Sequence, residues 1–250
     1  MAKPSEITLG NGDRVLILYE NRAVLAVDKP RGWLLAPSSW SNTKRNLQTA
    51  LESGIRAGDF WARSRQLKYL RFVHRLDAET TGVLLLAKSP GALVALSALF
   101  ETRRVDKRYW AVIEGVPASP QWSCRLKIAP HPQHKGQMMV DQPHGKPAET
   151  RFRVLEARNG LTLVEAQPLT GRTHQIRLHL AATGNAVLGD ELYGKSEPGV
   201  RALALRAVRL DYTDPFTRCR VQIRAPVEGF LREYGFVQSV ELKEAGGLAG

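Results

Sequence analysis

The sequence predicts an α+β fold with a mixed, antiparallel-rich central β-sheet flanked by helices and loops. Segments with strand character outnumber segments with helix character, and several strands follow one another along the chain. No internal repeat is visible in the 250 residues. Apolar residues make up 43% and charged residues 24%, which are ordinary globular values and exclude collagen-like, low-complexity and wholly disordered chains.

Buried strands are expected where short apolar runs end at turn residues. Residues 23–28 form such a run before Pro30, and residues 83–87 form another. Apolar residues alternate from Tyr109 to Ile113 and stop at Gly115. Further strands are expected near residues 150–154, 161–166, 203–210 and 220–224. Residues 1–20 are polar and rich in turns, with a tight turn at 10–13.

Three helices are expected between these strands. One lies near residues 47–53, and a second begins at Ser89-Pro90, with proline at the first helical position. A third runs from residue 171 to 180 and stops at Gly184. The predicted organisation is an N-terminal extension (1–16), one catalytic domain (17–240) and a frayed tail (241–250).

The charge favours a polyanionic partner. Lys and Arg number 36 and Asp and Glu 24, which leaves a formal charge of +12 and a pI near 10.0. Cationic side chains release condensed counterions from phosphates, so such a surplus suits nucleic acid. Arg predominates over Lys and suits bidentate phosphate contacts. Composition alone leaves open a soluble protein with a basic bias.

The compartment follows from the cysteines and the N-terminus. Cys124 and Cys219 form no CxxC pair and are expected to be reduced thiols in a cytoplasmic protein. No apolar h-region of a signal peptide is present, and the longest apolar run is too short to span a bilayer, so no membrane association is expected. His174 and His179 are five residues apart, which is the wrong spacing for one helical metal face, and no metal site is expected.

A basic and aromatic stretch covers residues 61–75. It contains no acid and interleaves cations with rings, as in a groove that binds phosphates and stacks bases. The alternative is a solvated basic face whose aromatic side chains lie in the core. Its members are Trp61, Arg63, Arg65, Lys68, Tyr69, Arg71, Phe72 and Arg75.

Reactive groups are densest in residues 74–82, HRLDAETTG. Asp77 enters the strand at a turn, and a partly desolvated carboxylate there could act as a nucleophile or base if a cation held it ionised. The alternative is a turn or N-cap aspartate with a structural Arg partner. Asp77 and Glu79 are the nearest approach to a carboxylate pair in this segment, but a glycosidase-like acid and base pair is not expected.

A second dense segment spans residues 168–180. Gly171 and Thr173 lie at the expected helix start, where free N–H groups favour an anion, and Arg172 would project from the first turn. Arg177 lies one turn further along and could reach inward to a carboxylate. The alternative is an amphipathic helix with solvated Arg and His side chains.

These segments resemble the RluA-type RNA pseudouridine synthase family. HRLDAETTG resembles its signature HRLDxxTSG. Three further matches follow in the family's order and are joined by two shorter ones, so the resemblance runs from about residue 17 to 235. The ordered matches are KRYWAVIEG (107–115), GRTHQIRLHL with GDELYG (171–180 and 189–194) and LALRA (203–207), and the shorter ones are DKPRG (28–32) and GKPAET (145–150).

The resemblance implies isomerisation of uridine to pseudouridine in tRNA or rRNA by base flipping, without a metal or redox cofactor. Asp77 matches the family's essential aspartate. Tyr109 matches a tyrosine that stacks on the flipped base, and Arg177 matches an arginine that pairs with the aspartate. Leu205 matches an apolar residue that packs against uracil. Arg75, Arg172, Arg71 and Arg104 are the expected RNA contacts.

The departures from the family pattern are modest. Thr81 replaces Ser and keeps the hydroxyl, and Arg206 replaces the usual His. The loop at residues 38–46 is unusual, and the extra N-terminal RNA-binding domain of many relatives is not expected, so RNA choice would rest with the catalytic domain of a monomer. Two alternatives to a synthase are a non-catalytic RNA-binding protein on the same fold and a glycosidase that releases uracil.

Overall fold

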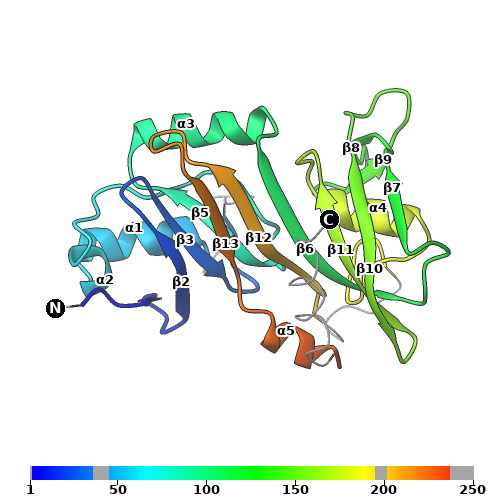
Figure 1. Ribbon diagram of the computed structural model, residues 1–250, viewed down its shortest axis with the longest axis horizontal. Coiled ribbons are helices and arrows are strands. Elements are labelled where there is room, and N and C mark those ends of the chain that lie inside the picture. Colours follow the sequence, from blue (N-terminus) through cyan, green and yellow to red (C-terminus); the bar gives the residue numbers. More distant parts are fainter. Residues whose placement is uncertain (1, 36–44, 195–201, 237–250) are drawn as a thin grey trace. The chain divides into compact units, whose positions relative to one another are not determined.

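The computed structural model describes residues 2–35, 45–194 and 202–236 (Figure 1). Most of the loop at 38–46 and the tail at 241–250 lie outside these ranges. The chain divides into two compact units: the first unit is residues 1–106 with 209–225, and the second unit is residues 107–208 with 226–250. Strands β6 (Val105–Glu114) and β12 (Leu205–Thr213) each cross the boundary. The domain bounds at 17 and 240 stay a prediction, although a strand runs across residue 16.

Antiparallel strands form the sheet of the first unit. β3 and β5 are apolar almost throughout because both faces are covered, whereas β2 is mostly half-buried. The neighbours along this sheet are β1 (Glu6–Thr8), β2 (Arg14–Glu20), β3 (Val24–Lys29) and β5 (Thr81–Ala87), with β4 (Arg71–Phe72) paired to β5 and β13 (Arg220–Arg224) paired to β12.

Three helices belong to the first unit, α1 (Leu47–Ala57), α2 (Phe60–Arg63) and α3 (Pro90–Glu101). α3 begins where the sequence predicts, because the Ser89 side chain accepts a hydrogen bond from the Ala92 N–H and Pro90 needs no partner there. Leu96 and Leu99 of α3 lie in one apolar core with residues of β3, β5, β12 and β13. The helix therefore covers part of this sheet.

The second unit holds another antiparallel run of strands, β6, β11 (Leu161–Pro168), β10 (Thr150–Arg158) and β7 (Gln121–Cys124). A two-stranded sheet pairs β8 (Ile128–Pro130) with β9 (Met138–Val140). Helices α4 (Gln175–Ala182) and α5 (Glu228–Glu233) complete it. Its core joins apolar residues of β6, β10, β11, α4 and α5.

The predicted α+β class and antiparallel-rich sheet are confirmed, and all the expected strands are present. Two expectations are wrong in detail. Residues 1–20 contain strands β1 and β2, because apolar Ile7 and Val15 are buried on one face beside the turn. The helix expected from residue 171 begins at Gln175, because His174 adopts a left-handed backbone with φ of 55°. Arg172 therefore lies in the preceding turn.

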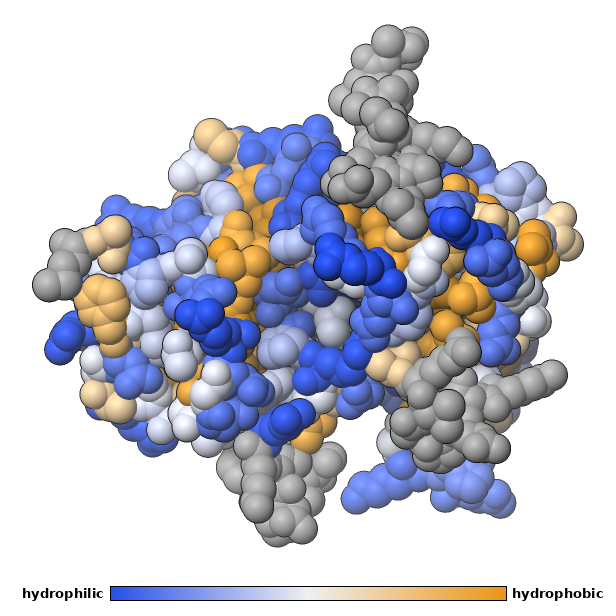
Figure 2. Space-filling view, turned by 90° about the horizontal axis from the view of Figure 1, so that it is seen from below, coloured by the Kyte–Doolittle hydropathy of each residue, from blue (hydrophilic) through white to orange (hydrophobic). Residues whose placement is uncertain are grey.

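The face seen in Figure 2 is a mosaic of hydrophilic residues and smaller hydrophobic patches. Among the described residues, the exposed large hydrophobic side chains belong to separate segments. No described helix is long and apolar enough to cross a membrane. Cys124 and Cys219 are both free thiols.

We expect Ser89→Ala to lower the free energy of unfolding by about 1 kcal/mol, because the Ala92 N–H loses its acceptor at the start of α3. Urea denaturation measures this change. Ser97→Ala, in the middle of the same helix, is the control and should leave stability unchanged or slightly raised, since Ala is the better helix former. Equal effects of the two substitutions would show that the cap contributes nothing.

Candidate active site

Asp77 lies in the first unit, on the loop between β4 and β5. It is half-buried, and its backbone carbonyl accepts a hydrogen bond from the Thr80 N–H at 3.2 Å. Thr80 is buried, and Gly82 adopts φ of 106°, a conformation that glycine allows without strain. A tight turn therefore presents the carboxylate at the entry to a buried strand, as the sequence predicts.

The buried Lys29 side chain holds this turn through hydrogen bonds to its backbone. Its side chain is 0% exposed, and its ammonium donates to the carbonyls of Ala78 at 2.6 Å, Thr80 at 3.0 Å and Pro30 at 3.0 Å. Burial lowers the pKa of Lys29 to about 8, although the negative charges of Glu79 and Asp77 oppose this shift. The buried cation thus fixes the loop and compensates its two carboxylates.

His74 is a structural member of the signature. Its Nε2 accepts a hydrogen bond from the Leu85 N–H at 3.1 Å, and its ring stacks on Phe100 with centroids 4.8 Å apart. This ties the start of the loop to β5 and α3, so the segment that carries Asp77 is anchored at both ends.

The expected RNA-binding cations of the first unit lie on its surface. Arg75 is exposed on the loop of Asp77, and Arg104 is exposed just after α3. Arg71 on β4 is partly exposed and forms an ion pair with Glu52 of α1. Their exposure is compatible with contact to phosphate.

The basic and aromatic stretch (residues 61–75) fits the expected RNA groove in some residues and the alternative, with aromatic side chains in the core, in others. Trp61 is buried in the protein, and the Arg65 side chain is only 3% exposed and pairs with Glu20 at 2.9 Å. Lys68 is exposed and Tyr69 is half-buried. The stretch is therefore not one continuous groove of cations and rings, because part of it is internal to the fold.

In the second unit, a chain of hydrogen bonds fixes the start of α4. The Gln175 side chain donates to Glu149 O and Thr150 Oγ1, both at 2.9 Å, and accepts from Thr170 Oγ1 and the Arg172 N–H. Its amide is buried and satisfied on both sides. The Gln175 side chain therefore stabilises the start of the helix, where the N-cap residue His174 forms no side-chain cap hydrogen bond.

His179 continues the chain. Its Nε2 lies 3.0 Å from Leu126 O, which can only accept, so this nitrogen carries the hydrogen. Burial lowers the pKa of His179, which keeps the ring neutral and lets Nδ1 accept from Thr150 Oγ1 at 2.9 Å. His179 is therefore structural. No group of three or more His, Cys, Asp or Glu able to hold a metal is found in the part of the chain that the structure describes.

Arg177 on α4 forms a buried, bidentate ion pair with Asp190. Nε lies 2.8 Å from Oδ2 and Nη2 lies 2.7 Å from Oδ1. Asp190 Oδ1 also accepts from the N–H groups of Leu192 and Tyr193. The close turn needs Gly194, because a Cβ there would lie 2.6 Å from Asp190 O. Sequence reasoning predicted an inward carboxylate partner for Arg177 but did not single out Asp190.

Tyr193 completes this cluster. The Arg177 guanidinium carbon lies 5.3 Å from the centroid of its ring, a cation–π distance. The Tyr193 hydroxyl lies 2.8 Å from His174 Nδ1 and accepts from the Met138 N–H at 2.8 Å. Tyr193 therefore connects β9 to the start of α4. The spacing of Gly189, Asp190 and Tyr193 was the available signal for it.

The remaining expected site residues also lie in the second unit. Tyr109 is half-buried on β6 and packs against the apolar core, opposite Ala166 of β11. Leu205 at the start of β12 is buried in that core. Arg172 donates from Nε to Pro147 O at 3.1 Å. Asp77 thus belongs to one unit and Tyr109, Arg177 and Leu205 to the other, and the pairing of Arg177 with Asp77 stays a prediction.

The sequence of this site matches a known family. Residues 23–182, which include both the Asp77 loop and Arg177, match the profile described as RNA pseudouridylate synthase. The chain belongs to the RNA pseudouridylate synthase family. It is an RNA uridine isomerase, and this confirms the enzyme class, the RNA partner and the family that the motifs indicate.

Curated relatives agree with this assignment. The chain is 34% identical over 227 residues to the ribosomal large subunit pseudouridine synthase C of Vibrio cholerae, covering 87% of this chain and 67% of the relative. It is 34% identical over 232 residues to the protein of the same name in Salmonella typhimurium, with 87% and 68% covered. The synthase chain thus spans about two thirds of the length of these relatives.

Solved structures support the fold. Human RNA pseudouridylate synthase domain containing 1 is similar with a TM-score of 0.70 at 26% identity, covering 92% of this chain and 94% of that one. Human RNA pseudouridylate synthase domain containing 4 has the same fold, with a TM-score of 0.70 at 23% identity over 89% and 94% of the two chains.

We expect the stability of the synthase to depend on Lys29 in alkaline solution. Its pKa is about 8 in the folded chain and near 10.5 in the unfolded one, so between these values the unfolded chain binds the proton more strongly. This group alone therefore makes the free energy of unfolding rise with pH, by roughly 2 kcal/mol from pH 8 to 9.5. Urea denaturation of wild type and Lys29→Met across this range measures the difference. Parallel pH profiles would contradict it.

We expect Asp190→Asn to lower the free energy of unfolding by about 3–5 kcal/mol, because it leaves the buried Arg177 cation without its carboxylate. Glu114→Gln removes one negative charge at an exposed position at the end of β6 and is the matched control. It should change stability by less than about 0.5 kcal/mol. A loss no larger than that of the control would mean that the pair is not stabilising.

Proposed function

We propose that this synthase converts uridine to pseudouridine in large-subunit rRNA, in the cytoplasm, with Asp77 as the catalytic residue. The rRNA assignment rests on the names of the curated relatives at 34% identity. The assignment of Asp77 rests on its place in HRLDAETTG (residues 74–82), which resembles the family signature HRLDxxTSG, and on the turn that presents it. The single observation that carries the proposal is a half-buried carboxylate on a loop clamped by the buried Lys29 ammonium.

The reaction demands such a carboxylate. The N-glycosidic bond of uridine breaks, the uracil turns in the site, and its C5 bonds to C1′ while the C5 proton leaves. A carboxylate held ionised can assist either by attack on C1′ or by removing a proton from the ribose. The buried Lys29 ammonium holds the carbonyls of Ala78 and Thr80, and the tight turn fixes the direction of the Asp77 carboxylate. No cofactor is required because the detached uracil stays in the pocket.

The second unit supplies the proposed partners of the base. Tyr109 would stack on the flipped uracil and Leu205 would pack against it. Arg177 would pair with Asp77 through the N–H groups that Asp190 does not use, since Asp190 engages two of the five on the guanidinium. The ion pair with Asp190 holds the guanidinium rigid, so Arg177 would arrive preorganised.

Cations on the surface of each unit would hold the RNA backbone. A uridine inside a helix is out of reach, so the enzyme must extrude it, and extrusion needs phosphate contacts around the site. Arg75 and Arg71, with Arg104, are exposed or partly exposed in the first unit. Arg172 is half-buried in the second. We propose these four as RNA contacts of a monomeric enzyme.

A test separates catalysis from RNA binding. Asp77→Asn should abolish tritium release from rRNA labelled at uracil C5 while RNA affinity changes by less than about twofold, because binding rests on phosphate contacts. Glu79→Gln, an exposed carboxylate two residues away, is the matched control and should retain turnover.

The same assay tests the competing functions. Full tritium release by Asp77→Asn would refute the assigned role. RNA binding by wild type without any release would favour the non-catalytic binder. Free uracil in the product would indicate a glycosidase. Labelled tRNA in a parallel reaction tests the choice of rRNA.

A further inference from the structure

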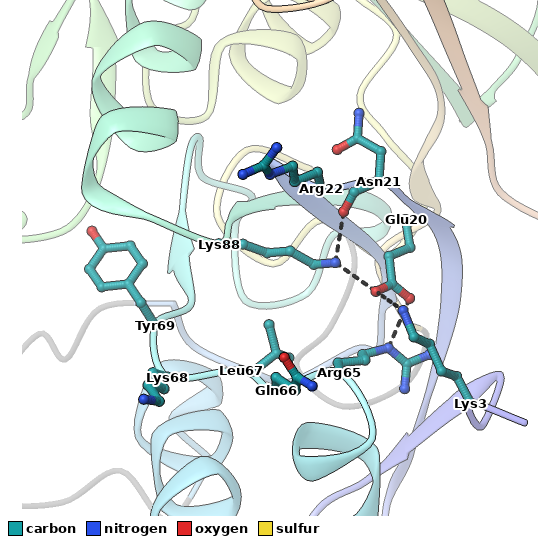
Figure 3. A pocket seen from close by; sticks show the side chains of 10 residues that line it. All are labelled: Lys3, Glu20, Asn21, Arg22, Arg65, Gln66, Leu67, Lys68, Tyr69 and Lys88. Carbon is teal, nitrogen blue, oxygen red and sulfur yellow. Dashed lines mark hydrogen bonds and ion pairs between the residues drawn. The ribbon is translucent and has the colours of Figure 1, made fainter. Parts of the chain in front are cut away.

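A cavity of about 540 Å³ lies in the first unit, away from the Asp77 loop. Residues before β1, around the β2–β3 turn, after α2 and after β5 line it (Figure 3). Five of its ten lining residues are cations and one is an acid. The lining residues are Lys3, Glu20, Asn21, Arg22, Arg65, Gln66, Leu67, Lys68, Tyr69 and Lys88.

Three of the cations converge on the single acid. Glu20 receives Lys88 at 2.6 Å, Arg65 at 2.9 Å and Lys3 at 3.3 Å. Burial alone would raise the pKa of Glu20, but these hydrogen bonds and charges hold it below its usual value. The carboxylate is therefore ionised and already more than neutralised, so it does not repel an incoming anion strongly.

The cations are in excess and repel one another. Burial lowers the pKa of Lys88, its contacts with Glu20 oppose the shift, and the charges of Lys3 and Arg65 lower it further. Five cations around one carboxylate leave a surplus of four positive charges at this cavity. A bound anion would relieve this repulsion.

The other two cations that line the cavity are Arg22 and Lys68. Arg22 and Lys68 are exposed, and neither forms an ion pair or side-chain hydrogen bond with the residues that the structure describes. In Figure 3 Arg22 extends from the β2–β3 turn above Lys88, and Lys68 lies beside Tyr69 on the segment after α2. The Tyr69 ring adds a flat face at which a base could stack.

The backbone turn after α2 positions the lining residues Lys68 and Tyr69. The Leu67 N–H donates to Ala62 O and the Gln66 N–H to Arg63 O, a helix-ending turn whose left-handed position is Gln66, at φ of 53°. Glycine is the usual residue there. The turn reverses the chain and brings Lys68 and Tyr69 beside the β2–β3 turn.

The cavity lies at the opposite end of β3 and β5 from the Asp77 loop. Val24 pairs with Ala87 at the cavity end, and Lys29 pairs with Gly82 at the other. Five residue steps along the strand span roughly 17 Å. This equals about five stacked nucleotides at 3.4 Å each. A contact here would therefore be remote from the reacting uridine.

We propose that this cavity is a phosphate-binding subsite for the RNA strand, remote from the uridine that reacts. The inference rests on the proposed function, because it takes RNA as the ligand. Arg22 and Lys68 would contact phosphodiester oxygens at the rim, while Arg65 and Lys88, held by Glu20, supply the fixed positive field behind them. RNA is favoured over a single small anion because the surplus cations are spread over several segments around the cavity, as a chain of phosphates requires.

Charge reversal at the rim tests the proposal. In Arg22→Glu/Lys68→Glu, the dissociation constant for unmodified large-subunit rRNA transcript should rise about tenfold or more, and the slope of log affinity against log KCl concentration should fall by about one to two. Arg14→Glu/Lys135→Glu makes the same change in net charge at two exposed residues outside the cavity and is the matched control. It should stay within about twofold of wild type.

Turnover and folding complete the test. Tritium release at saturating RNA should change less than about twofold, because neither residue lies in the Asp77 loop. Urea denaturation checks the fold, and Arg22→Gln/Lys68→Gln gives a smaller loss of affinity if the reversal variant is unstable. Affinity and salt slope equal to those of the control would overturn the proposal.

A free nucleotide distinguishes the source of the phosphate. Uridine monophosphate titrated against wild type and the rim variant should bind weakly to both. Tight binding to wild type that the variant loses, with an unchanged rRNA salt slope, would assign the cavity to a small anion and overturn the RNA assignment. If wild type releases no tritium, the proposed function fails, whereas the binding arms still decide whether the cavity holds RNA phosphate.

Discussion

The position of Asp77 depends on one buried lysine. A carboxylate at a turn is normally free to move with its loop. Here the Lys29 ammonium donates hydrogen bonds to the carbonyls of Ala78 and Thr80 in the loop and of Pro30 at the end of β3. Burying a cation is unfavourable unless it is paired and hydrogen-bonded. The loop supplies both the carbonyl partners and the nearby carboxylates, so cation and loop require each other. Pro30 suits this arrangement because it stiffens the chain where β3 ends.

In the second unit, a buried arginine has the corresponding structural role. The Arg177 guanidinium is fixed by the Asp190 carboxylate and covered by the Tyr193 ring, while Gln175 secures the turn before the helix. In each unit, a buried cation whose partners come from loops therefore holds the expected site residues in place. Such pairs contribute geometry more than net stability, because desolvation offsets much of their attraction.

The sequence predicted what local patterns determine and missed what distant partners determine. The strand at residues 83–87 and the helix cap at Ser89 follow from apolar runs and capping chemistry, and both are present. The local pattern predicts too early a start for α4, because Gln175 is held by Glu149 and Thr150, about 25 residues away, which no local pattern reveals. The basic stretch predicts Arg65 at the surface, but its side chain is buried and pairs with Glu20, 45 residues away. The motifs identify Asp77 and Arg177 as site residues, whereas the role of Asp190 as the partner of Arg177 is visible only in the folded chain.

The division of the chain has a consequence for its synthesis. The apolar core of the first unit joins Val24 and Leu85 to Leu210 and Ile223, which are made more than a hundred residues later. Until the ribosome has delivered β12 and β13, this core stays open, while residues 107–208 emerge as one nearly continuous block. The first unit to begin translation thus stays incomplete until residue 225 has been made, and the apolar residues of its sheet are exposed to aggregation in the meantime.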